Sequence, residues 1–357
     1  MLYHLLYPIR AKIPGLGVIE YITFRTVMAT LTSMVVSFVI GPYILRWLRK
    51  IGAKQPIRSD GPNTHFTKEG TPTMGGIMIL ISVLLSVLLW ARLDNYYVWA
   101  AIVSMVGFGA IGFLDDFAKL KGGSRGLSAN IRIVAEAALA IAIGFIIFSS
   151  PRSNTQFMSP FFKNFMPDIG IFYLLLALVV IIGSANAVNL TDGLDGLAIG
   201  PVMVTAGVLL VFTYVAGNVK ISSYLKIIYI SGAGSLSIIC GALIGAGLGF
   251  LWFNTFPAQV FMGDVGSLSL GAVLGTMAVV SKQEFGLLIA GGIFVLETVS
   301  VIVQVVSFKL TGKRVFMMAP LHHHFELKGW PEPLVTVRFW IISVILALVA
   351  LSTLKLR

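Results

Sequence analysis

Residues 109–121 read GAIGFLDDFAKLK, in which an apolar run ends on two adjacent carboxylates. Asp115 and Asp116 repel each other and resist dehydration, and acids at a membrane boundary are functional candidates by default. The cations that follow are Lys119, Lys121 and Arg125. Hard divalent cations prefer carboxylate oxygens and also bind phosphates, so the stretch favours metal-dependent phosphate chemistry. A structural alternative is a simple ion pair with Lys119 at helical spacing.

Composition places this stretch in a membrane protein. The chain has 357 residues, of which 57% are hydrophobic and 11% charged, whereas a soluble domain carries about 25% charged residues. The expected fold class is therefore an all-α polytopic integral membrane protein. The net charge of +11 fits basic loops facing anionic lipid, and we find no nucleic-acid module. A single cysteine, Cys240, excludes an intrachain disulfide.

A membrane-spanning helix needs about 20 apolar residues. Runs of this kind predict about ten transmembrane helices, near 23–46, 74–93, 97–115, 130–149, 169–187, 197–217, 227–250, 265–281, 287–308 and 337–354. We expect a single membrane-embedded domain over residues 1–357, without internal repeats. Residues 1–21 form a short amphipathic stretch that is typical of an interfacial lead-in.

Basic residues predict the orientation of these spans. The loops that carry the polar motifs are 47–73, 116–129, 188–196, 251–264 and 309–336. With flanking residues they hold 15 Lys and Arg, against 6 in the internal loops of the other set. The excess predicts that the first set is cytoplasmic and that both termini lie outside. The active site is then expected at the cytoplasmic face.

Two corners combine amides with carboxylates. In residues 184–197, Asn186 and Asn189 lie near Asp192, and amides beside carboxylates suit a sugar or base edge. Asp192 or Thr191 is also expected to cap the next helix. A second corner, residues 252–267, carries possible ligands and a planar ring, namely Asn254, Phe261 and Asp264. Asp264 is interpreted as an N-cap or a metal ligand, and Phe261 as a base-stacking residue or a membrane anchor.

Two further loops carry groups that suit phosphates. In the first, Lys68 precedes Gly75 and Gly76, where a helix start attracts phosphate, or where Thr73 simply caps the helix. The last loop contains His322, His323 and His324. Adjacent histidines diverge, so a zinc site is not expected and hydrogen bonds to a diphosphate fit better. Buried polar candidates within the spans are Glu136, Glu297 and Gln304, which serve either helix packing or substrate.

These motifs together resemble one enzyme superfamily along the whole chain. The pair Asp115-Asp116, the run NLTDGLDG (189–196), FMGD (261–264) and PLHHH (320–324) resemble the polyprenyl-phosphate N-acetylhexosamine-1-phosphate transferases. The three histidines favour the bacterial phospho-N-acetylmuramoyl-pentapeptide transferase (translocase I) branch. That resemblance implies transfer of the phospho-sugar from UDP-MurNAc-pentapeptide to undecaprenyl phosphate. The implied products are lipid I and UMP, made at the bacterial inner membrane with Mg²⁺ as cofactor.

The resemblance also implies roles for individual residues. Asp264 would bind the metal directly, Asp116 would orient the metal or Asp115, and Asp115 would activate or orient the lipid phosphate. A covalent phosphoryl-aspartate intermediate stays open. The expected substrate-binding residues are Lys68, Lys121, Asn186, Asn189, Asp192, Asn254, Phe261, Gln304, His322, His323 and His324. Membrane lipid would surround the chain, and a homodimer is one oligomeric form that the resemblance implies.

Two other functions compete with this interpretation. One is the same chemistry with UDP-N-acetylglucosamine as donor, which an assay with each nucleotide sugar distinguishes. The other is a secondary transporter, whose carboxylates would lie near the bilayer midplane in repeated halves. Here the acids gather at one face and no repeat is visible, so the transferase is favoured. A scaffold would not need acids at several separate corners.

Overall fold

The computed structural model describes residues 1–10, 12, 15–53, 70–122, 126–151, 153–159, 162 and 166–355. Within them the regular elements are helices, and one isolated bridge joins Gln156 and Asp168. The elements are α1 (Leu2–Leu6), η1 (Leu16–Glu20), α2 (Ile22–Lys50), α3 (Gly76–Trp90), α4 (Tyr96–Gly122), α5 (Ala129–Phe148), α6 (Phe172–Thr191), α7 (Ile199–Ala216), α8 (Val219–Leu225), η3 (Ala233–Ser235), α9 (Leu236–Asn254), α10 (Gly263–Ser281), α11 (Glu284–Ala290), α12 (Gly292–Thr311), α13 (Leu321–Leu327), α14 (Glu332–Ser352) and η4 (Thr353–Lys355).

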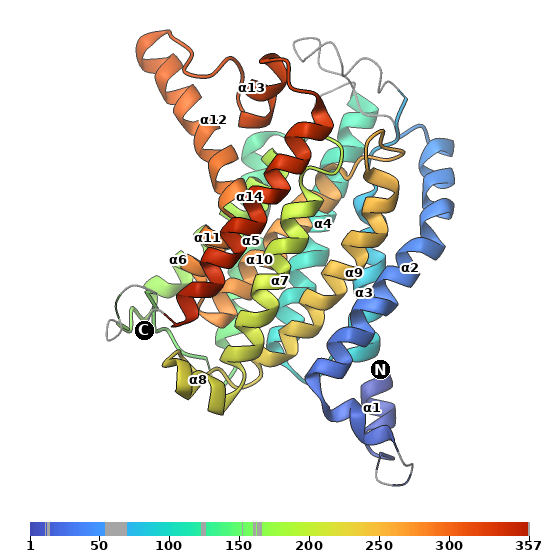
Figure 1. Ribbon diagram of the computed structural model, residues 1–357, viewed down its shortest axis with the longest axis vertical. Helices are drawn as coiled ribbons and strands as arrows, with labels where there is room; N and C mark the ends of the chain where they lie inside the picture. Colours follow the sequence, from blue (N-terminus) through green and yellow to red (C-terminus); the bar gives the residue numbers. More distant parts are fainter. Residues whose placement is uncertain are drawn as a thin grey trace.

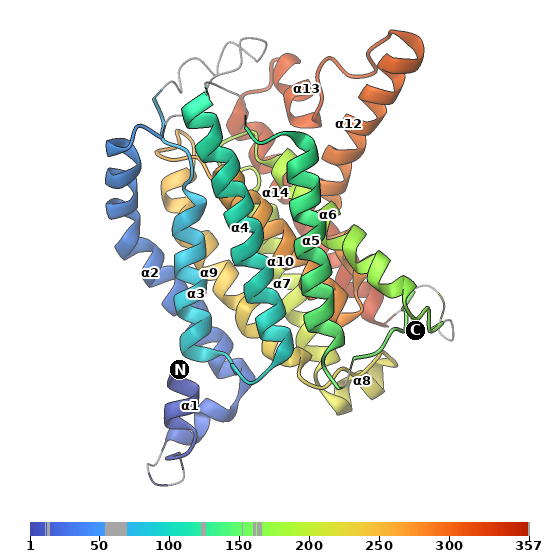
Figure 2. The same cartoon turned by 180° about the vertical axis from the view of Figure 1, so that it is seen from behind.

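The helical membrane fold is confirmed. Over the described residues, nine helices are long and apolar enough to cross a membrane, and α3 is a shorter apolar helix of 15 residues. Each of the ten predicted segments corresponds to one of these helices or to α3. Figure 1 shows them as a bundle in which both termini lie toward the end opposite α13, and Figure 2 shows the same bundle from behind.

Helix α10 forms the centre of the bundle, packed against α3, α4, α6 and α7. Its sequence is rich in glycine, alanine and serine, which lets neighbouring backbones approach closely. Polar side chains tie it to its neighbours: Ser269 Oγ donates to the Met105 carbonyl at 2.8 Å, and Ser184 Oγ donates to the Gly271 carbonyl at 2.7 Å. These two bonds therefore hold α10 against the first half of α4 and the last two turns of α6.

The chain before α3 is paired with the corner before α10. The Gly75 amide donates to the Phe261 carbonyl at 2.8 Å, and the Gly76 amide donates to the Met262 carbonyl at 2.9 Å. Non-helical backbone is tolerated at membrane depth when protein covers it, and residues 72–76 are buried. These amides are thus used within the protein, which corrects the expectation that this helix start attracts phosphate.

Gly76 is instead required for helix packing. A Cβ on Gly76 would lie 2.3 Å from the backbone N and Cα of Gly266 in α10. Gly76→Ala is expected to destabilise the fold by about 1–3 kcal/mol, because α3 and α10 must move apart. Thermal unfolding in detergent measures this. Gly183→Ala in α6 is the matched control, since a Cβ there would meet nothing within 4 Å, and it should leave the Tm unchanged or raise it. Equal Tm changes for both variants would contradict this packing role.

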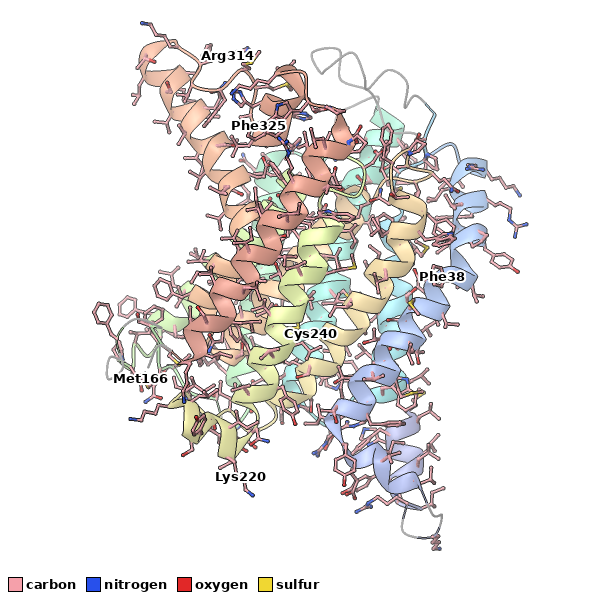
Figure 3. The ribbon with its side chains drawn as sticks, viewed as in Figure 1. Phe38, Met166, Lys220, Cys240, Arg314 and Phe325 are labelled. Atoms are coloured by element: carbon pink, nitrogen blue, oxygen red, sulfur yellow. The ribbon has the colours of Figure 1, made fainter. Side chains whose placement is uncertain are left out.

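At the other side of the bundle, α12 tilts away from the other long helices (Figure 1). The short helix α13 lies between the end of α12 and the start of α14 and contacts both helices. Leu194, Leu197, Ile293, Val335 and Phe339 form a small apolar core beneath this arch. Figure 3 places Phe325 of α13 and Arg314 at one end of the molecule, with Met166 and Lys220 at the other.

Two predicted helix boundaries, the end of α4 and the start of α9, are wrong. Helix α4 continues to Gly122 rather than ending before Asp116, because Lys119 pairs with Asp115 one turn away. Helix α9 begins at Leu236 rather than near 227, because Gly232 adopts a left-handed φ of 99° and interrupts the apolar run.

The predicted N-caps are also wrong. Helix α7 begins after Ala198 and α3 after Gly75, and neither has a side-chain cap. Thr191 Oγ1 instead donates to the Ala187 carbonyl at 2.8 Å within the last turn of α6. Asp192 is the residue that ends α6 rather than one that starts α7.

Candidate active site

Three aspartates from two helices converge at one end of the bundle. Asp115 and Asp116 lie near the end of α4, and Asp264 lies in the first turn of α10. Each offers a carboxylate oxygen, and these oxygens all lie within 4.8 Å of one another. Asp115 and Asp116 are 2% and 5% exposed, so their charges are largely removed from water. The predicted convergence of the three acids is confirmed.

The ammonium of Lys119 lies among these carboxylates. Its Nζ is 2.6 Å from Asp115 Oδ2, 2.7 Å from Asp264 Oδ2 and 3.7 Å from Asp116 Oδ1. The simple ion pair and the acidic cluster are therefore both present. One ammonium cannot balance three carboxylates if all three are ionised.

Backbone groups fix the orientation of the carboxylates. The Val265 amide, in the first turn of α10, donates to Asp116 Oδ2 at 3.2 Å. The Leu127 amide donates to Asp115 Oδ1 at 2.7 Å and so ties the loop after α4 to the cluster. Gly112 allows this approach, since a Cβ there would lie 2.2 Å from the Asp264 carbonyl oxygen. The acids are thus presented by rigid helix ends.

Arg132 in α5 extends the site toward α6. Its guanidinium contacts Asp264 Oδ2 at 3.4 Å and Glu136 Oε1 at 3.0 Å, and it donates to the side-chain oxygens of Asn186 and Asn189 at 3.2 and 3.3 Å. Asn189 Nδ2 donates to Asp264 Oδ1 at 2.7 Å. Of the two asparagines predicted to bind substrate, Asn189 therefore contacts Asp264 directly, and Asn186 contacts Arg132 and Glu136 beside it.

Asp192 lies at the edge of the same group, just after α6. Burial raises the pKa of Asp192 to about 8, with the negative charges of Asp264, Asp116 and Asp195 adding to the effect. The Gly263 amide opposes that shift by donating a hydrogen bond. Asp192 is thus close enough for the charges of Asp116 and Asp264 to raise its pKa. A cation bound at the three aspartates would favour the ionised form of Asp192.

The three histidines have different hydrogen-bond partners, although the rings of His322 and His323 do not diverge and their centroids lie 4.2 Å apart. His322 is 1% exposed, and Glu297 Oε1 accepts from its backbone amide at 3.2 Å and contacts its Nδ1 at 3.1 Å. Its buried Nε2 has no hydrogen-bond partner among the described residues and faces Gly193, where a Cβ would lie 2.2 Å away. His323 Nδ1 contacts Glu326, whereas His324 Nδ1 accepts from the Met317 amide at 3.1 Å.

Other predicted substrate residues lie in supporting positions. The side-chain oxygen of Asn254 accepts from the Gly196 backbone N–H at 3.0 Å, and its side-chain Nδ2 donates to the Val260 carbonyl at 2.8 Å. Gln304 bonds the backbone of Val315 and Phe316 in the loop before α13. Lys121 is exposed, with its Nζ 4.6 Å from the Phe117 ring centroid. Substrate binding by these residues stays a prediction.

Phe261 is half-buried, and its backbone pairs with the segment before α3. That pairing positions the FMGD corner whether or not the ring stacks on a base. Lys68 lies outside the described residues.

Comparison with known proteins places the chain in a family. The model of the family described as Glycosyl transferase family 4 matches residues 98–282, which include all three aspartates. The first signature of phospho-N-acetylmuramoyl-pentapeptide-transferases matches residues 68–80. Proteins named phospho-N-acetylmuramoyl-pentapeptide-transferase from Syntrophus aciditrophicus and Pelobacter propionicus are 55% and 54% identical, each over 100% of both chains. The chain belongs to the phospho-N-acetylmuramoyl-pentapeptide-transferase family. A family member from Thermodesulfovibrio yellowstonii is likewise 54% identical over both full lengths.

Membership of this transferase family agrees with the observed bundle. The long apolar helices and the full-length relatives together make the chain an integral membrane protein and a phosphotransferase of glycosyl transferase family 4. Transferases of this family are metal-dependent, and the three-aspartate cluster is the group among the described residues that could hold a metal ion.

Sequence reasoning misses the basic partners of the cluster. In the sequence Arg132 is only a cation that flanks a loop, although it contacts both Asp264 and Glu136. Its spacing of four residues from Glu136 is the available signal for an ion pair on one helix face. The sequence suggests Asp115 as a partner for Lys119, and nothing in it places Lys119 beside Asp264.

Proposed function

We propose that this protein transfers phospho-N-acetylmuramoyl-pentapeptide from UDP-MurNAc-pentapeptide to undecaprenyl phosphate, giving lipid I and UMP. The observation that carries the proposal is the group of three carboxylates, within 4.8 Å of one another, at one end of a membrane helix bundle. Relatives that are 53–55% identical over their whole length carry the name of this activity. The reaction would form the first membrane intermediate of peptidoglycan synthesis.

We propose that Mg²⁺ binds at the three aspartates, and the residues present fit it. If ionised, Asp115, Asp116, Asp264 and Glu136 carry four negative charges, whereas their contacts Lys119 and Arg132 carry two positive ones. A divalent cation would balance this difference, and Mg²⁺ prefers one or two carboxylates together with phosphate and water. When bound, Mg²⁺ supplies charge that offsets repulsion between the two anionic substrates and favours the departing phosphate.

The protein's own residues would divide the remaining work. Asp264 and Asp116 would hold the cation, while Lys119 and Arg132 would move from carboxylates to substrate phosphates when it binds. Asp115 would orient the lipid phosphate for attack. Its Oδ1 accepts from the Leu127 amide, whereas its Oδ2 pairs with Lys119 and would be freed when Lys119 moves, so a covalent phosphoryl-aspartate stays open. Asn186, Asn189 and Asp192 would contact the uridine and sugar.

His322 is proposed to hold the diphosphate through Nε2. As the imidazolium, its Nδ1 would donate to Glu297, and its Nε2, which faces Gly193, would donate to a phosphate oxygen. His322→Gln is expected to lower turnover about 100-fold, as loss of a preorganised donor does elsewhere. His324→Gln should cost much less turnover, because its ring instead supports the 317 backbone. Steady-state kinetics of the two purified variants test this, and equal losses would contradict the assignment.

We further propose that the acidic end faces the cytoplasm of a bacterial inner membrane, with both termini outside. The basic loops at this end support that orientation. Cytoplasmic nucleotide substrate could then reach the aspartates directly, while the polyprenyl chain stays in the bilayer.

The activity is tested by UMP release from purified protein. UDP-MurNAc-pentapeptide should release UMP only when undecaprenyl phosphate is present, and the lipid product should carry the phospho-sugar. UDP-N-acetylglucosamine at the same concentration should release little. Preferential use of UDP-N-acetylglucosamine would instead assign the other donor, and no lipid-dependent UMP from either sugar would refute the proposed transfer.

A further inference from the structure

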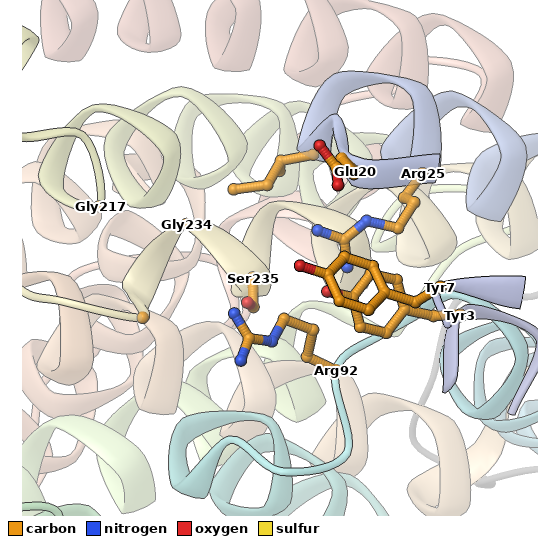
Figure 4. A pocket seen from close by; sticks show the side chains of 10 residues that line it. Tyr3, Tyr7, Glu20, Arg25, Arg92, Gly217, Gly234 and Ser235 are labelled. Carbon is orange, nitrogen blue, oxygen red and sulfur yellow. The ribbon is translucent and has the colours of Figure 1, made fainter. Parts of the chain in front are cut away.

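A cavity of about 330 Å³ lies at the end of the bundle opposite the three aspartates. It is open on one side and is lined by residues of α1, η1, the first turn of α2, the turn after α3, the end of α7 and the segment around η3. Figure 4 shows Arg25 and Arg92 entering it from different elements, with Ser235 and the rings of Tyr3 and Tyr7 beside them. A volume of this size holds about ten water molecules, which is enough for a phosphate group.

The main indication that this cavity binds a ligand is Arg25. It is 2% exposed, yet its Nε has no hydrogen-bond partner and, among the described residues, it forms no ion pair. Its contacts are a 3.5 Å hydrogen bond from Nη1 to the Trp90 carbonyl and the Tyr3 ring, 4.5 Å from the guanidinium. A buried charge is costly unless it is paired, so Arg25 is short of an anionic partner.

The acids near the cavity are already engaged elsewhere. Glu20 pairs with Arg10, and Asp94 Oδ2 pairs with Arg92 Nη2 at 2.7 Å. Arg25 also lies in the first turn of α2, a turn without acidic residues, where the helix dipole is positive. The cavity therefore has a surplus of positive charge and lacks an acceptor.

The surrounding surface points to a lipid as the source of that acceptor. Helix α2 continues from Arg25 as a membrane span with Val27 and Leu31 exposed at 57% and 46%. Leu5 of α1 is also exposed, at 68%. A headgroup in the cavity would thus have apolar surface beside it for its acyl chains, whereas a free anion would use none of this surface.

We propose that this cavity binds the phosphate of an anionic phospholipid in the leaflet opposite the active site, with Arg25 and Arg92 as its ligands. Guanidinium groups match phosphate oxygens through paired N–H donors, which a lone ammonium cannot do. The site is separate from the aspartates, so it stands or falls independently of the proposed transferase reaction.

Binding can be measured on the purified full-length protein by thermal shift and native mass spectrometry. Short-chain phosphatidylglycerol should bind and raise the Tm, while phosphatidylcholine of the same chain length and inorganic phosphate should do so much less. Arg25→Gln is expected to weaken phosphatidylglycerol binding at least tenfold. Arg92→Gln, at a more exposed position, should also weaken it and covers the case in which Arg25→Gln fails to fold.

Lys220→Gln is the matched control, because it removes one positive charge from the same end of the molecule at an exposed position of α8. It should bind phosphatidylglycerol like the unaltered protein. Binding that survives both arginine substitutions, or that is equally strong for phosphatidylcholine, would overturn the proposal. A Tm rise with inorganic phosphate equal to that with phosphatidylglycerol would overturn the assignment to lipid.

Discussion

Asp264→Asn is expected to lower turnover by about three orders of magnitude, a loss typical of removing a group that stabilises phosphoryl-transfer charge. Asp264 is the one member of the cluster contributed by α10, and it contacts Lys119, Arg132 and Asn189 at once. An amide of the same shape keeps the packing but removes the charge. The variant should therefore insert and fold normally while UMP release falls.

Asp168→Asn is the control for this change. Asp168 is exposed and lies outside the cluster, so the same chemical substitution there should leave kcat unaltered. Size-exclusion profiles and Tm would verify that both variants are folded. Normal turnover by Asp264→Asn would remove this residue from the metal site.

Asp115→Asn is expected to lower kcat by about two to three orders of magnitude and to leave UDP-sugar affinity within about threefold, because its role falls in the transition state rather than in binding. Asp115 contacts Lys119 and the Leu127 amide rather than the asparagines of α6. The loss should therefore appear in kcat and not in the dissociation constant of the nucleotide sugar.

Equilibrium binding of the nucleotide sugar, measured beside steady-state kinetics, separates the two effects. Rapid-quench detection of a protein-bound phosphoryl-sugar in the unaltered enzyme addresses the covalent alternative. Unchanged kinetics in Asp115→Asn would refute an active-site role for this carboxylate, and weaker sugar binding with unchanged kcat would move it to the donor site.

The membrane-spanning helices and the Asp115-Asp116 pair could be predicted because the local sequence indicates both. Runs of about 20 apolar residues mark the spans, and adjacent carboxylates are rare enough in such runs to stand out. The convergence of Asp264 with Asp115 followed from the family resemblance and from their shared membrane face, since neither residue indicates its distant partner.

The missed features depend on tertiary contacts. The predicted span at 74–93 begins two residues before α3, because the Gly75 and Gly76 amides donate to the carbonyls at 261 and 262, a contact that periodicity does not encode. The hydrogen bonds from Asn254 and Gln304 to the backbone of nearby loops are likewise tertiary contacts that the sequence does not show, and substrate binding by both residues stays a prediction. The burial of Arg25 could not be predicted from the sequence either, because an arginine at the start of a membrane span usually reaches water.

The account depends on a single divalent cation held by Asp116 and Asp264 beside Asp115, and metal-binding stoichiometry tests this most directly. Protein stripped with EDTA and titrated with Mn²⁺, with free ion followed by electron paramagnetic resonance, should bind one ion per chain that Mg²⁺ displaces. Asp264→Asn should lose that site and Asp168→Asn should keep it. The same affinity and stoichiometry in Asp264→Asn, or a site that persists after all three aspartates are changed to asparagine, would contradict the account.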